Sequence, residues 1–190
     1  MEDQLRAGTY SLLAALLRDV PDAGLLQQLS RIEPEGPAGD ELAGAWQDLR
    51  RAALDAVPES LSREFHELFI GLGRGQIVPY GSWYLTGFLM EKPLGELRRD
   101  LARLGFERQD SVREPEDHAA ALCEVMAMLI HDDARPLTVQ RQFFESHMGN
   151  WFEILFRDLE QAPAAGFYRS VARLGGAFTR LEKHYLAMPA

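Results

Sequence analysis

The residues best suited to chemistry stand together in the run Glu-Pro-Glu-Asp-His at positions 114–118. The run comes directly before an apolar stretch over residues 119–130, so we expect it to form the first turn of a buried helix. Acidic side chains suit that place because the first backbone N–H groups of a helix are unpaired and its N-terminus is electropositive. Proline is tolerated there as well. A helix start does not require His118, so the run is also a candidate site.

A second unusual segment lies upstream. Residues 71–82 hold four glycines, Pro79 and several apolar side chains, and Trp83 and Tyr84 follow at once. A plain linker would be more polar. Glycines beside exposed aromatic side chains indicate a backbone shaped to meet a partner. The alternative is a loop that folds back and fills the core.

Five histidines call for a test of metal binding, and their spacing argues against it. None has a carboxylate three residues before it, as the Glu-x-x-His pairs of a di-iron bundle require. The pair His66-Glu67 is not followed by the second histidine of a zincin helix. A single cysteine, Cys123, excludes thiolate zinc sites and intrachain disulfides, and its apolar neighbours predict a buried thiol. We therefore expect no resident metal, no cofactor and no catalytic residue.

The sequence His131-Asp132-Asp133 resembles the His-Asp dyad of helical metal-dependent phosphohydrolases, which would make the protein an enzyme. The dyad needs further ligands, and a histidine near a helix C-terminus is also explained by the helix dipole. The glycines of residues 71–75 lack the Lys-Ser/Thr of a phosphate-binding loop. No Gly-x-Ser-x-Gly elbow is present either. The phosphohydrolase remains the alternative from a different functional class.

The chain has 190 residues, of which 46% are hydrophobic, and a formal net charge of −9. This length and composition predict one folded domain over residues 1–190. The acidic balance argues against nucleic acid and anionic membranes as partners and favours a basic peptide. No apolar run approaches the roughly 20 residues of a membrane span, and the first residues lack the basic region of a secretory signal. We therefore expect a soluble, cytoplasmic protein.

The elements that would position these residues are helices. Apolar side chains recur at helical spacing, and no alternating β-branched run is long enough for a strand. Proline and glycine separate the helical runs. The sequence predicts an all-α, compact single-domain bundle of about seven to nine helices. The expected helices cover residues 5–17, 24–32, 41–56, 61–72, 84–104, 119–130, 137–143 leading into 144–159, and 167–185.

Three segments together resemble the TorD/DmsD/NarJ family, whose members are chaperones for the maturation of molybdenum-containing redox enzymes. Residues 65–71 (FHELFIG) are similar to an aromatic-x-x-Leu-Phe-x-Gly helix end, and residues 79–85 (PYGSWYL) to a Pro-Trp/Tyr-Gly-Ser-x-Tyr-Leu turn. Residues 114–118 match a Glu-Pro-x-Asp-His signature in full. The aromatic run 143–151 resembles a helix start near the family's C-terminus. Val78 and Tyr80 depart from the common pattern, which leaves the fine partner specificity open.

The resemblance implies an all-helical, non-catalytic fold that binds the twin-arginine signal peptide of an enzyme precursor. Such a signal carries two guanidiniums followed by an apolar stretch, so its receptor needs carboxylates beside an apolar surface. Residues 114–117 would supply the carboxylates, and loss of Asp117 would weaken binding about tenfold or more. The implied signal-peptide-binding residues are Glu114, Pro115, Glu116, Asp117, His118, Leu68, Phe69, Tyr80, Ser82, Trp83 and Tyr84.

The implied partner is the catalytic subunit of a molybdenum-cofactor oxidoreductase, bound in the cytoplasm before cofactor insertion and export. A NarJ-like assembly factor for a subunit that is not exported is the alternative within the family. Members can exchange helices between protomers, so we expect a monomer or a helix-swapped homodimer, with the connection 105–114 as the hinge. His118 either donates to a peptide carbonyl or fixes the carboxylate beside it, and the sequence leaves both roles open.

Overall fold

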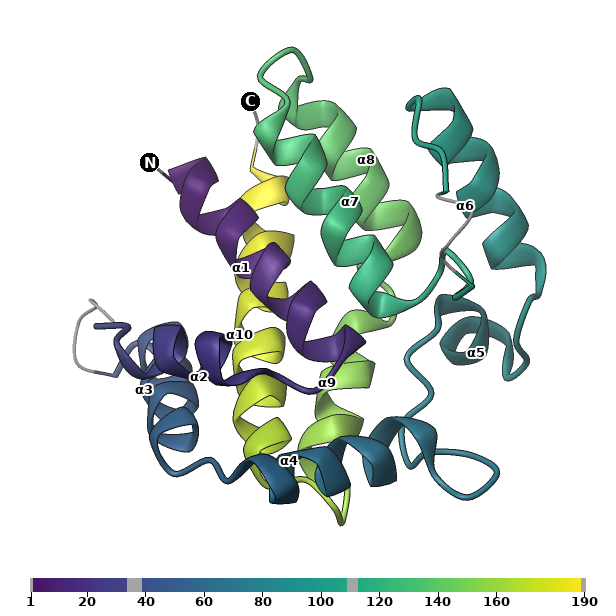
Figure 1. Cartoon of the computed structure of the whole chain (residues 1–190). Coiled ribbons are helices and arrows are strands. Elements are labelled where there is room, and N and C mark those ends of the chain that lie inside the picture. Colours follow the sequence, from purple (N-terminus) through teal and green to yellow (C-terminus); the bar gives the residue numbers. More distant parts are fainter. Residues whose placement is uncertain (1, 34–38, 109–112, 189–190) are drawn as a thin grey trace. The chain divides into compact units, whose positions relative to one another are not determined.

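The computed structural model describes residues 2–33, 39–108 and 113–188, and over these ranges the chain is built from helices without a strand (Figure 1). The all-α prediction is confirmed. The described residues form ten α-helices and one π-helical turn, where the sequence predicted about seven to nine helices. They are α1 (Glu2–Arg18), α2 (Ala23–Ser30), α3 (Glu41–Leu54), α4 (Pro58–Phe65), the π-turn η1 (His66–Ile70), α5 (Gly81–Thr86), α6 (Lys92–Arg103), α7 (Ala119–His131), α8 (Leu137–His147), α9 (Phe152–Gln161) and α10 (Phe167–Ala187).

Two predicted helices are broken in the structure. The run 84–104 is not one helix, because Gly87 and Met90 adopt left-handed backbone angles (φ 82° and 59°) that end α5 before α6 begins. Pro93 stands in the first turn of α6, where a missing N–H is tolerated. The apolar run 144–159 is likewise divided between α8 and α9.

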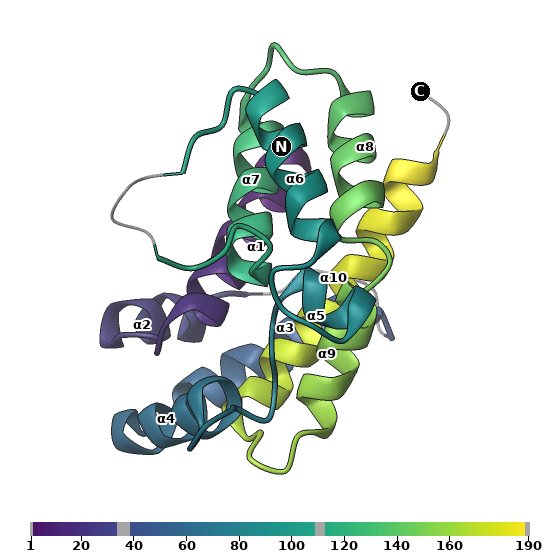
Figure 2. The ribbon, with the colours of Figure 1, turned by 90° about the vertical axis from the view of Figure 1, so that its right-hand side faces the viewer.

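The chain falls into two compact units, of which the first comprises Met1–Leu17, Pro79–Phe152 and Leu186–Ala190. Within it α7 and α8 run side by side, as two views agree (Figure 2). Met126 and Phe144 are buried in its core, and Arg6 of α1 donates to Gln140 of α8 at 3.1 Å. Cys123 is fully buried, and burial raises the pKa of its thiol. Residues 109–112 of the predicted hinge lie outside the described residues.

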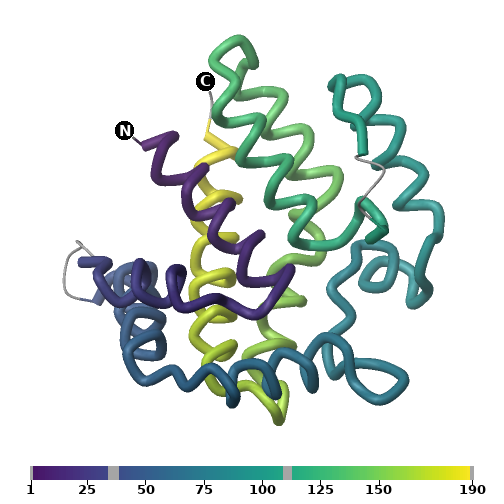
Figure 3. Tube along the Cα trace, viewed as in Figure 1, coloured from purple at the N-terminus to yellow at the C-terminus, as the bar shows by residue number. Residues whose placement is uncertain are grey.

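The second unit comprises Arg18–Val78 and Glu153–Tyr185. Its helices α2 and α3 lie side by side along the trace (Figure 3). The N-terminus of α10 is held by Glu64 of α4, whose carboxylate accepts the backbone N–H groups of Gly166, Phe167 and Tyr168 at 2.8, 3.1 and 2.7 Å. These bonds satisfy donors that a helix start would otherwise leave unpaired.

The sequence left two interpretations of the glycine-rich segment 71–78: a surface shaped to meet a partner, or a loop that fills the core. Its two ends differ in this respect. Ile77 is buried, and its N–H donates to the carbonyl of Leu68 at 2.8 Å, so this end folds back onto the core. At Gly75 a Cβ would lie 2.4 Å from the Leu68 oxygen, which explains the glycine. Leu72, at the other end, is fully exposed.

Candidate functional site

The candidate site is organised by backbone pairing between two segments of the first unit. Gly81 donates to the carbonyl of Asp117 at 2.9 Å, and Ala119 donates to the carbonyl of Pro79 at 2.8 Å. Residues 80 and 118 form the isolated antiparallel bridge between them. The pairing brings the N-terminal end of α5 to the start of α7 (Figure 2). Two of the three motifs in the sequence therefore build one structure.

The run 114–118 precedes helix α7 and does not form its first turn, which corrects the prediction from sequence. The helix begins at Ala119, and His118 is its N-cap. Its ring Nδ1 accepts the N–H of Ala120 at 3.1 Å. A ring nitrogen that accepts carries no proton, so this bond requires the neutral ring protonated at Nε2. Capping explains why an imidazole stands at this position.

Asp117 is a buried carboxylate that holds the start of α5. Asp117 is 3% exposed, and its Oδ2 accepts the N–H of Ser82 at 2.8 Å. Ser82 is fully buried as well. Among the described residues, Oδ1 of Asp117 and Oγ of Ser82 have no hydrogen-bond partner. Both side chains support the site from beneath its surface, and their contact with a ligand stays a prediction.

The two glutamates of the run have different environments. Glu116 is largely buried and accepts from Arg98 of α6 at 2.8–2.9 Å, with Arg108 at 3.8 Å. Burial acts to raise the pKa of Glu116, but the Arg98 hydrogen bond, a backbone hydrogen bond and the charges of Arg98 and Arg108 together outweigh it, so the pKa lies below its usual value. Glu114 is exposed and accepts from the hydroxyl of Tyr80. Its donor is an uncharged phenol, so this contact leaves the carboxylate's charge uncompensated.

Several aromatic rings lie at the start of α5. The rings of Tyr80 and His118 pack edge to face, 4.9 Å apart between centroids, and burial together with Glu114 raises the pKa of the phenol well above its usual value. Tyr84 stacks on Trp151 at 5.3 Å, and the Trp151 indole donates to the carbonyl of His147 at 2.7 Å. Trp83 and Tyr84 are each half-buried.

Pro115, Leu68 and Phe69 complete the predicted set. Pro115 is half-buried and accepts the His118 N–H through its carbonyl at 3.1 Å. Leu68 and Phe69 belong to the second unit, where Leu68 is fully buried and Phe69 packs on Tyr168 at 5.3 Å. A binding role for Leu68 would need that core to open. The first unit holds the other nine predicted residues.

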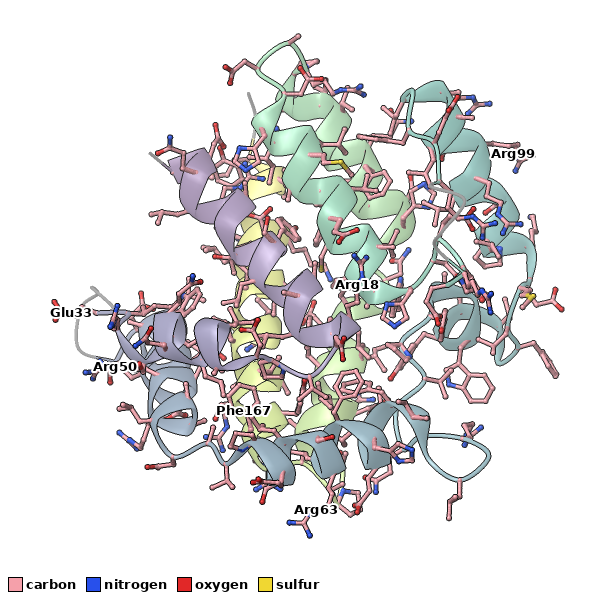
Figure 4. The ribbon with its side chains drawn as sticks, in the orientation of Figure 1. Arg18, Glu33, Arg50, Arg63, Arg99 and Phe167 are labelled. Atoms are coloured by element: carbon pink, nitrogen blue, oxygen red, sulfur yellow. The ribbon has the colours of Figure 1, made fainter. Side chains whose placement is uncertain are left out.

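Sequence reasoning missed the residues that contact the run from other elements. Arg98 and Arg108, which neutralise Glu116, come from α6 and the segment after it, and no pattern in the sequence links them to the run. Arg99, the next residue of α6 after Arg98, projects from the outer side of that helix (Figure 4). Trp151 belongs to an aromatic run that the sequence did single out, although its place under Tyr84 follows only from the tertiary structure.

The His131-Asp132 pair has a structural explanation. Asp132 is the C-cap of α7, and its carboxylate accepts from Arg135 at 2.7 Å and from the N–H of Ala134 at 3.1 Å. These bonds lower the pKa of Asp132. Throughout ranges 2–33, 39–108 and 113–188, no group of three or more metal-ligating side chains is placed to hold an ion. In the same ranges no helix is both long and apolar enough to cross a membrane.

Comparison with known proteins decides the family. A family model described as the nitrate reductase delta subunit matches residues 36–157, well over half of the chain. The chaperone protein TorD of Vibrio atlanticus is 31% identical over 176 residues, which cover 85% of this chain and 80% of that protein. The chain belongs to the NarJ/TorD family. This family consists of molybdoenzyme maturation chaperones and is not catalytic, so the phosphohydrolase alternative is wrong.

Other NarJ/TorD proteins agree with this placement. The chaperone proteins TorD of Vibrio parahaemolyticus and Aeromonas salmonicida are 29% and 28% identical, over 85% and 86% of this chain and 79% and 77% of their own lengths. A crystal structure of a candidate redox enzyme maturation protein from Archaeoglobus fulgidus matches with a TM-score of 0.63 at 20% identity. The match covers 92% of this chain and 93% of that one, and it establishes the shared fold.

Proposed function

We propose that this protein is a cytoplasmic chaperone that binds the twin-arginine signal peptide and the cofactor-free form of a molybdenum-cofactor oxidoreductase. It would shield the signal until the cofactor is inserted and the enzyme is ready for export. The observation that carries the proposal is the exposed carboxylate of Glu114 at the start of α5, in a chain of the NarJ/TorD family.

The chemistry of a guanidinium supports this assignment. Arginine presents planar donors that match a carboxylate, and such a charge-assisted pair is stronger than a neutral hydrogen bond. Glu114 offers that acceptor through its contact with Tyr80, the residue directly before α5, and Trp83 on α5 is a half-buried aromatic residue of the kind on which a guanidinium can stack. The net charge of −9 attracts a cationic peptide over the whole surface, and added salt would weaken that attraction.

Asp117 and His118 act on the same site in a different way. The buried Asp117 carboxylate accepts the Ser82 N–H, and His118 caps α7. Both side chains therefore hold the paired segments in place. Loss of either would reduce peptide binding by displacing Tyr80 and Glu114. Direct contact between the Asp117 carboxylate and an arginine stays a prediction beside this supporting role.

Calorimetry with a signal peptide that carries the arginine pair tests the proposal. We expect binding in the micromolar range or tighter, and at least about tenfold weaker binding when both arginines are replaced by lysine. Glu114→Gln should weaken binding of the parent peptide to a similar extent. Glu145→Gln, a matched change at an exposed carboxylate on α8, should leave it unchanged. If the unaltered protein bound neither peptide, the proposed function would be wrong.

A NarJ-like assembly factor for a non-exported subunit is the second candidate, and the description of the matching family model favours it. Such a factor would bind a client segment without an arginine pair. Equal affinity for the arginine and lysine peptides, with Glu114→Gln having no effect on either, would support this second candidate over the first.

A further inference from the structure

The loop after α5 presents large apolar side chains to solvent. Phe88, Leu89 and Met90 are consecutive and 69%, 46% and 73% exposed, and Leu85 on the last turn of α5 is 43% exposed. We call these four residues the apolar turn. A run of three exposed apolar residues disfavours solubility and is uncommon unless it serves binding. The signal-binding residues predicted from the sequence do not include any of them.

The apolar turn has a defined backbone. The Thr86 hydroxyl donates to the carbonyl of Ser82 at 2.8 Å and lies 3.2 Å from the N–H of Phe88, which donates to it. Gly87 closes the helix with a left-handed conformation. Met90 is also left-handed, at φ 59°, and among the described residues it is the one non-glycine with a positive φ. Such a conformation is strained for a side chain like methionine and persists only where the surroundings hold it.

Helix α5 connects the apolar turn to the exposed carboxylate. Tyr80, which donates to Glu114, immediately precedes α5, and the turn follows its last residue. A helix of this length rises about 9 Å, and an extended peptide covers that distance in about three residues. An acidic end and an apolar end therefore lie along one element, separated by a few residues of peptide.

We propose that the apolar turn binds the apolar stretch of the signal peptide, while Glu114 binds a guanidinium of the arginine pair before it. This inference rests on the proposed function and adds the residues that bind the apolar stretch of the signal. The order along α5, acidic and then apolar, complements a ligand whose cationic residues precede its apolar ones. A second copy of this chain would also present an apolar turn, but the group beside that turn is acidic. It would therefore place a second carboxylate, and no cation, near Glu114.

The test compares two proteins with two peptides by calorimetry. The variant combines Phe88→Ser with Met90→Asn, because asparagine accepts the left-handed backbone that position 90 requires. One peptide is the full signal, and the other keeps the arginine pair but has serine throughout the apolar stretch. The variant should bind the full signal at least about tenfold more weakly than the parent does. Both proteins should bind the serine peptide with the same reduced affinity.

Leu5→Ser is the matched control, since Leu5 is 70% exposed on α1 of the same unit. It should bind the full signal as the parent does. A second measurement is independent of folding in the variant: a photoreactive phenylalanine placed three residues after the second arginine should crosslink the unaltered protein within residues 85–90. Crosslinking confined to other helices would overturn the inference.

The outcomes separate the two proposals. If the double variant binds the full signal as tightly as the parent, and Glu114→Gln does not, the apolar turn is wrong and the proposed function stands. If the parent binds no twin-arginine peptide, both are wrong. If the parent self-associates in sedimentation, and the double variant is monomeric with unchanged peptide affinity, the turn belongs to a contact between copies and the inference is overturned.

Discussion

Two helix starts in this molecule use acidic residues in opposite ways. At the start of α10, the Glu64 carboxylate accepts hydrogen bonds from three backbone N–H groups. At the start of α5, Asp117 accepts a backbone N–H, and the neighbouring Glu114 accepts only from a side-chain phenol among the contacts described above. A carboxylate near a helix start has a structural role when backbone N–H groups donate to it. It is available to a ligand when another residue does the capping.

Replacing Glu64 should have the largest effect on stability. Glu64→Ala removes an acceptor shared by three N–H groups, so we expect the free energy of unfolding to fall by about 2–4 kcal/mol. Urea denaturation measures this loss. Glu59→Ala, at an exposed position on the same helix, should cost well under about 1 kcal/mol. Equal losses in the two variants would contradict a structural role for Glu64.

Replacing Asp117 should have the next largest effect on stability. Asp117→Ala leaves the Ser82 N–H without its acceptor, and we expect a loss of about 1–2 kcal/mol, the usual cost of a lost helix cap. Asp117→Asn keeps an acceptor of the same shape and should recover most of that stability, and peptide binding with it. Binding that required the negative charge itself would be lost in both variants, which would return Asp117 to direct contact with the peptide.

Glu116 should contribute a smaller, pH-dependent effect. Its pKa in the folded protein lies below its value in the unfolded chain, so its stabilisation is present above the unfolded pKa and is lost as pH falls through the folded one. Glu116→Gln should therefore flatten the decline in unfolding free energy below about pH 4.5, by about 1 kcal/mol or less. Thermal unfolding from pH 6 to pH 3 measures the difference. A parallel decline in both proteins would show that the Arg98 contact adds no stability.

The sequence predicts the helical class well, because apolar periodicity and the proline and glycine breaks are local properties. It missed the end of α5, since Gly87 and Met90 lie inside a run that keeps a helical pattern. It brought residues 79–85 and 114–118 to notice, yet their pairing depends on backbone hydrogen bonds between distant segments, which no spacing encodes.

The roles within the run could not be assigned from the sequence either. Glu114, Glu116 and Asp117 are three carboxylates within four residues, and only the tertiary structure decides which is exposed, paired or buried. The resemblance placed all three carboxylates and His118 among the binding residues without ranking them. In the structure Asp117 and His118 cap helices, and Glu114 is the exposed carboxylate.

A double-mutant cycle tests the claim that Glu114 binds an arginine of the signal. Calorimetry would combine Glu114→Gln with replacement of the peptide's arginine pair by lysine. A carboxylate bound to a guanidinium predicts that the two changes are coupled, with the combined loss about 1–3 kcal/mol smaller than the sum of the single losses. Losses that simply add would contradict the claim, because Glu114 and the arginines would then act independently.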